Sequence, residues 1–144
     1  MKVALVTDEL CPINQFVLEW LQAKGINYIC FGAYASNTEE PWVTAIAKAA
    51  EAVSKGLCDE GVFFCWSGTG ASIVANKTKG LRAALCTDAE TAKLARVWNH
   101  ANVLALSNRS LTPQVAEEIL NAWFAPYDQE LGIKGIQALK QLDV

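Results

Sequence analysis

Short apolar runs alternate with longer amphipathic segments along the chain. Five runs have the length and composition of buried strands, and they lie at residues 3–7, 26–31, 61–65, 82–86 and 102–106. The segments between and after them have helical patterns, at 12–24, 42–55, 71–77, 89–98, 112–124 and 131–142. Because alternating strands and helices are typical of a parallel sheet, the pattern predicts an α/β protein: a three-layer α/β/α Rossmann-like sandwich with a five-stranded parallel sheet.

Local signals support several of these boundaries. Thr112 and Pro113 are a suitable cap and first-turn residue for one helix, Asp88 is a suitable cap for another, and Gly25 is a suitable stop. Residues 32–40 are mostly polar and are expected to form a loop. With no internal repeat or linker, residues 1–144 are expected to form a single domain.

Composition and charge narrow the function classes. A net charge of −3 without a basic run argues against a nucleic-acid partner, and no apolar run reaches the roughly 18 residues of a membrane span. The start of the chain lacks the features of a signal peptide. Five cysteines without a CxxC pair, together with one histidine, make a structural zinc site improbable and indicate reduced thiols in the cytoplasm.

The stretch from Gly61 to Lys77, GVFFCWSGTGASIVANK, carries the clearest chemical signal. A buried strand, a glycine turn and a helix start together direct backbone N–H groups toward one point, where an anion or oxyanion binds. Cys65 ends the strand, and the hydroxyls of Ser67 and Thr69 follow it. The stretch lacks the dinucleotide fingerprint and the P-loop motif, so a tight turn of small packing residues is the alternative.

Polar residues follow other strands as well. Asp8, Thr87 with Asp88, and Arg109 come directly after three of the predicted strands. Because the carboxyl ends of parallel strands share one edge of a sheet, these groups are expected to face the crevice that also holds Cys65. Acids, hydroxyls, one thiol and one fixed positive charge suit a small polyhydroxylated ligand, which can be anionic.

Three stretches resemble the family of ribose-5-phosphate isomerase B and the galactose-6-phosphate isomerase subunits: CWSGTGASIVANK (65–77), GLRAALCTDAETAKLAR (80–96) and NHANVLAL (99–106). The resemblance is nearly full length. It implies the same fold and an aldose–ketose interconversion through an enediolate, without a metal or organic cofactor. It also implies a homodimer, or a tetramer, whose active sites are built by two subunits, with the C-terminal segment at about 129–142 packing on the partner.

The resemblance also implies roles for single residues. Cys65 falls on the family's usual base, and amides at a helix N-terminus stabilise a thiolate. The loop that would hold the enediolate oxygens contains Ser67, Gly68, Thr69 and Gly70. Residues that match substrate contacts are Asp8, Asn99 and, for a phosphate, Arg109.

The chain departs from the family pattern at several of its functional positions. Trp66 replaces a glycine, Trp98 replaces a histidine, and both are candidate platforms for stacking a sugar. His100, the only histidine, falls where the family has aspartate and is a candidate acid or base for ring opening. The arginine-containing C-terminal segment of the family is replaced by residues 128–134, and no arginine follows Arg109.

Three interpretations follow from these departures. The first is an isomerase of the same chemistry that acts on a different sugar, unphosphorylated or acidic. The second is a ribose-5-phosphate isomerase with displaced phosphate ligands, for which Lys134 and Lys140 offer point charges. The third is a non-catalytic sugar-binding homologue.

Overall fold

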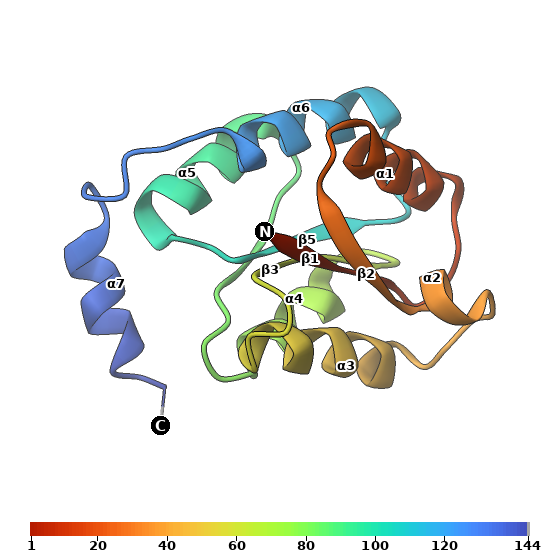
Figure 1. Ribbon diagram of the computed structural model, residues 1–144, viewed down its shortest axis with the longest axis horizontal. Helices are drawn as coiled ribbons and strands as arrows, with labels where there is room; N and C mark the ends of the chain where they lie inside the picture. The colour runs from red at the N-terminus through yellow and green to blue at the C-terminus, as the bar shows by residue number, and fades with distance from the viewer. Residues whose placement is uncertain (144) are drawn as a thin grey trace.

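A five-stranded parallel sheet forms the centre of the molecule (Figure 1). The structure is a computed structural model that describes residues 1–143. The strands are β1 (Lys2–Thr7), β2 (Asn27–Gly32), β3 (Glu60–Cys65), β4 (Ala83–Leu85) and β5 (Val103–Ser107). They are ordered β2-β1-β3-β5-β4, and every neighbouring pair is parallel. The predicted sheet is confirmed, with strand bounds that differ by no more than one residue at either end.

Helices cover both faces of the sheet (Figure 1). One layer contains α1 (Pro12–Ala23), α5 (Ala89–Asn99) and α6 (Pro113–Phe124), and the other contains α3 (Trp42–Ser54) and α4 (Thr69–Asn76). The four central residues of β1 are all apolar because both faces of the strand are covered. Val3 and Leu5 pack with α1, α5 and α6, whereas Ala4 and Val6 pack with α3 and α4. The three-layer sandwich is therefore confirmed.

Two helix predictions differ from the structure near the carboxyl edge of the sheet. Residues 32–40, expected to form a loop, contain the short helix α2 (Ala33–Ser36). Asn37 ends it in the left-handed region, with a φ of 60° and its N–H bonded to the carbonyl of Ala33. Helix α4 begins at Thr69, two residues before the expected start, because Gly68 with a φ of 80° turns the chain first.

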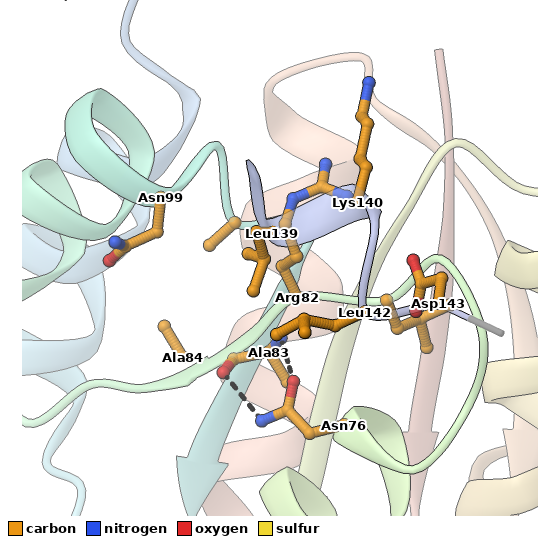
Figure 2. Close-up of a pocket in the computed structure, with 11 residues that line it drawn as sticks. Asn76, Arg82, Ala83, Ala84, Asn99, Leu139, Lys140, Leu142 and Asp143 are labelled. Carbon is orange, nitrogen blue, oxygen red and sulfur yellow. Dashed lines mark hydrogen bonds between the residues drawn. The ribbon is translucent and has the colours of Figure 1, made fainter. Parts of the chain in front are cut away.

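The C-terminal helix α7 (Ile133–Lys140) stands beside the sandwich, next to α5 (Figure 1). Gly132 lies against the carbonyl oxygens of Val97 and Trp98, and Ile136 is the one buried residue within α7. A cavity of about 430 Å³ lies between α7 and β4, and Figure 2 shows Arg82 and Lys140 among its lining residues.

Strand β4 is an edge strand whose outer side is occupied by an amide. The Asn76 side chain donates to the carbonyl of Ala83 at 3.1 Å and accepts from the N–H of Ala83 at 2.8 Å (Figure 2). This pair of bonds reproduces the exchange between neighbouring strands. The short strand is thus paired on both sides, by β5 and by one side chain.

The strand order creates a crevice at the carboxyl ends of β1 and β3. The chain leaves β1 toward β2 on one side and later returns to β3 on the other side. Crevices of this kind are where open α/β sheets bind ligands. Among the helices of residues 1–143, none has the length and apolar character needed to cross a bilayer.

Candidate active site

A cavity of about 320 Å³ opens at the crevice between β1 and β3. Its lining residues are Asp8, Trp42, Cys65, Trp66, Ser67, Thr69, Gly70 and Ile73. The sequence predicts six of these eight, all except Trp42 and Ile73. The fold therefore brings the predicted base, the acid and the glycine turn to one place.

Cys65 is the last residue of β3 and is 6% exposed. Its Sγ accepts a hydrogen bond from the N–H of Ala71, in the first turn of α4, at 3.4 Å. The N-terminus of α4 thus directs both a backbone donor and its dipole at the sulfur. The sulfur lies beside the open space of the cavity, where a bound ligand would contact it.

Backbone bonds fix the turn after Cys65. The carbonyl of Cys65 accepts from the N–H of Asn108 at 2.9 Å, and that of Trp66 accepts from the N–H of Arg109 at 3.0 Å. Gly68 follows in the left-handed conformation, where a Cβ would lie 2.6 Å from the Leu85 side chain and 3.0 Å from the Leu106 backbone. Gly68 is therefore required for the turn, and it is not among the residues that line the cavity.

Two hydroxyls meet at the mouth of the cavity. The Oγ of Ser67 and the Oγ1 of Thr69 are 2.7 Å apart, and either is able to donate. Both side chains line the cavity, so one hydroxyl hydrogen remains available for a ligand oxygen.

Asp8 supplies the only carboxyl group among the residues that line the cavity. Its Oδ1 is buried and has no hydrogen-bond partner within the described part of the chain. Burial raises the pKa of Asp8, and the nearby charges of Glu9 and Glu39 raise it further, against hydrogen bonds from its own backbone and that of Glu9. An unpaired buried oxygen favours a ligand that brings a hydroxyl donor.

A buried amide network holds the loop that carries Asp8. Asn108 donates to the Thr7 hydroxyl at 3.0 Å, and Asn14 donates to the Asn108 side chain at 2.7 Å. The Thr7 hydroxyl in turn donates to the Glu9 carbonyl at 2.7 Å. The ends of β1 and β5 are thereby tied together. Sequence reasoning missed this network because buried asparagines have no distinctive local pattern.

Trp98, Asn99 and His100 lie at the end of the sheet opposite to Cys65, where the strands begin. Helix α5 starts after the carboxyl end of β4 and runs back, so its last residues reach the amino ends of the strands. Asn102, two residues after His100, lies at this end of the sheet, since its carbonyl accepts from the N–H of Gly61, near the start of β3, at 2.9 Å. Gly61 precedes Cys65 by four residues of strand, about 13 Å. A single chain therefore does not bring these three residues to the Cys65 cavity.

Arg109 does not line the cavity either. Its side chain is exposed, and its backbone N–H supports the Trp66 carbonyl. Within one chain, its identified contact with the site is through the backbone, whereas the sequence predicts a side-chain contact with an anion.

His100 is held by the residues around it. Its φ of 44° is left-handed, its carbonyl accepts from Arg82 Nε at 3.0 Å, and its ring centroid lies 5.9 Å from that of Tyr127. Its Nε2 is buried without a partner among residues 1–143. Arg96 anchors the same segment by donating to the Ala101 carbonyl at 2.6 Å.

Two residues that line the cavity, Trp42 and Ile73, were missed from the sequence. A usable signal existed for both. Helices that follow parallel strands begin at the carboxyl edge of the sheet, so their first turns face the crevice. Trp42 is the first residue of α3, and Ile73 lies in the second turn of α4.

The comparisons with known proteins agree with this geometry. The sequence pattern described as Ribose/Galactose Isomerase matches residues 3–138. D-erythrulose-4-phosphate isomerase of Pectobacterium atrosepticum is 38% identical over 125 residues, which are 85% of this chain and 82% of that protein. Ribose-5-phosphate isomerase B of Clostridium thermocellum has a similar structure, with a TM-score of 0.90, 31% identity and coverage of 99% and 97% of the two chains.

A second solved structure is of ribose-5-phosphate isomerase B from Mycoplasma genitalium with bound ribulose-5-phosphate. It has a TM-score of 0.87 and 26% identity, and covers 98% of this chain and 95% of that one. A parallel sheet with a thiol and a glycine turn at its crevice, and relatives that are sugar-phosphate isomerases, define an aldose–ketose isomerase. The chain belongs to the ribose/galactose isomerase family. The predicted family, fold and enzyme class are confirmed.

Proposed function

We propose that this protein interconverts an aldose and a ketose through an enediolate, with Cys65 as the base that moves the proton between C1 and C2. The observation that carries the proposal is the Cys65 Sγ, bonded to the Ala71 N–H at the start of α4 and placed in a cavity with Asp8 and two hydroxyls. The thiolate takes the proton from C2 of the aldose and returns it to C1, while the proton of the C2 hydroxyl passes to the C1 oxygen, so that the aldehyde becomes a hydroxyl and C2 becomes the ketone. Donors of the turn at 67–70 stabilise the enediolate oxygens, and Asp8 accepts a hydrogen bond from a substrate hydroxyl.

The active site is completed by a second copy of the chain. Asn99 and His100 lie at the edge of the sheet opposite Cys65, so a site that uses all three residues needs a partner subunit. In this homodimer, His100 of one subunit would serve ring opening in the other, where Trp98 and Asn99 would contact the substrate. Apolar side chains exposed on and after α7 support its packing on a partner, with Leu139 39% exposed and Leu142 74% exposed. A tetramer would add a second interface to this dimer.

The expected substrate is a short sugar, and separate observations bear on its length and on whether it is phosphorylated. The relative named D-erythrulose-4-phosphate isomerase and the neighbour with bound ribulose-5-phosphate support four- and five-carbon sugars. The loss of the C-terminal arginines favours a substrate that is unphosphorylated or carries a different acid. For a phosphorylated substrate, Arg109, Lys134 and Lys140 are the candidate phosphate contacts.

The thiols support a reducing compartment, the cytoplasm. All five cysteines of the described residues are free, and Cys58 and Cys86 are buried. Buried unpaired thiols persist most readily where glutathione keeps thiols reduced.

The test is exchange of the C1/C2 proton with deuterated water, followed by NMR. The panel contains erythrose, ribose and a hexose, each with and without phosphate, together with a uronate. Exchange is expected for at least one sugar and is expected to be lost in Cys65→Ala. It is expected to persist in Cys30→Ala, which removes a thiol from within the edge strand β2, away from the cavity. If Cys65→Ala kept its exchange rate, Cys65 would not be the base.

The missing arginines favour one second function, a sugar-binding protein without turnover. It predicts no exchange over the whole panel while the folded protein still binds a sugar by NMR. Exchange on any panel member would exclude it.

A further inference from the structure

Trp42 is fixed against the glycine turn of the proposed active site. A Cβ built on Gly70 would lie 2.8 Å from Cζ3 and 2.9 Å from Cε3 of Trp42, so the indole occupies the space that a side chain at 70 would take. The same indole is 45% exposed and lines the cavity that contains Cys65. The ring is therefore held by Gly70 while part of its surface remains free for a ligand.

The cavity is apolar on several sides and carries no positive charge. Trp42, Trp66 and Ile73 line it, and no lysine or arginine of the described residues does. Its one charged lining residue is Asp8, which also feels the negative charges of Glu9 and Glu39. A phosphate inside this cavity would meet the Asp8 carboxyl group without a compensating cation. The C–H face of a sugar, in contrast, stacks well on an indole.

We propose that Trp42 is a specificity-determining residue that binds the uncharged, reacting end of a short sugar chain by stacking, while any anionic group of the substrate lies outside the Cys65 cavity. This inference rests on the proposed function and assigns Trp42 a role in it. Trp42 would act mainly on binding, since its identified contacts are with Gly70 and the cavity and not with the sulfur of Cys65.

Comparing a free sugar with its phosphate ester distinguishes this role of Trp42 from general damage to the site. If Trp42 contacts only the uncharged end, its removal must weaken the binding of a free sugar and of its phosphate ester by the same factor. Removal of a residue near the phosphate would instead change the affinities for the free sugar and for the phosphate ester by different factors.

The experiment measures kcat and KM by proton exchange with erythrose and erythrose 4-phosphate, or with ribose and ribose 5-phosphate if these are the better probes. Trp42→Ala is expected to raise KM about tenfold for both members of a pair, with kcat changed much less. Trp42→Phe, which keeps an aromatic face, is expected to recover most of the loss. Val43→Ala is the matched control, because Val43 is the next residue of α3, is 48% exposed and does not line the cavity.

An unchanged KM in Trp42→Ala, or an equal loss in Val43→Ala, would overturn the inference while wild-type exchange kept the proposed function intact. Unequal factors for the free and phosphorylated sugars would also overturn it. If the wild type exchanged no probe, the proposed function would fail. Trp42 would then be judged by saturation-transfer NMR with the same sugars, where a signal lost in Trp42→Ala but retained in Val43→Ala supports stacking and any other result refutes it.

Discussion

Replacing Arg96 by methionine is expected to lower the free energy of unfolding by about 3–5 kcal/mol. Arg96 joins α5 to two other parts of the chain. Its Nη2 lies 2.8 Å from Glu60 Oε2 at the start of β3, and the side chains of the pair are only 12% and 15% exposed. Its guanidinium also covers the Trp123 ring at 4.7 Å and the Tyr127 ring at 5.0 Å.

The magnitude follows from what methionine would leave behind. Methionine fills much of the volume but donates no hydrogen bond, so the Glu60 carboxylate would lose its cation. Glu60 would keep the bond from Trp123 Nε1, at 3.0 Å, and the Ala101 carbonyl would lose its 2.6 Å donor. An uncompensated buried charge costs about 3–5 kcal/mol, whereas replacement of both members of a pair by apolar groups is often close to neutral. The double variant Glu60→Leu/Arg96→Met should therefore be more stable than Arg96→Met alone.

The assay is urea unfolding followed by circular dichroism, at matched protein concentration because association would shift the midpoint. Lys55→Met is the control, since Lys55 and Glu51 form an exposed ion pair in the same chain, with side chains 71% and 59% exposed. No measurable change is expected there. A loss below about 1 kcal/mol in Arg96→Met, the level of an exposed pair, would refute the assignment of Arg96 as a buried anchor.

Three further predictions concern titration and packing. The pKa of Asp8 is raised in the folded state, so its stabilising contribution is complete below the unfolded pKa of 3.8 and is lost as pH rises through the folded pKa. In urea unfolding, Asp8→Asn should therefore gain stability relative to wild type between pH 3.5 and pH 7. A difference in stability between the two proteins that stayed constant over this range would contradict the argument. Burial raises the pKa of Cys86 from 9.0 to about 12, so wild-type stability should fall above pH 9.0 by up to about 1.4 kcal/mol per pH unit and Cys86→Ala should flatten that decline. Gly70→Ala should displace the Trp42 indole, change tryptophan fluorescence and slow proton exchange, while Gly135→Ala, with open space around it, should leave both unchanged.

The sequence predicts the sheet well because its signals are local. Each strand is a short apolar run, and Thr112 and Asp88 cap their helices as expected, accepting bonds from Val115 and Thr91. Helix α2 was not predicted because it depends on two left-handed residues and on a close approach of Gly32 to the Thr7 carbonyl. Such tertiary contacts leave little trace in a polar stretch.

The site is predictable to the extent that chain neighbours form it. Residues 65–70 follow one strand, so most of them reach the cavity together, and Asp8 joins them from the adjacent strand. Trp42 comes from a distant segment and is seen only when the helices are placed. The resemblance associates Asn99 with Cys65, but their separation across the sheet becomes visible only in the fold.

The amide of Asn76 also limits how molecules of this protein are able to associate. A free edge strand exposes a row of donors and acceptors that another chain can extend, which leads to open-ended aggregates. At β4 the N–H and carbonyl of Ala83 are already engaged by Asn76. Growth of the sheet across this edge would first have to break both bonds, so extension of the sheet through β4 is disfavoured.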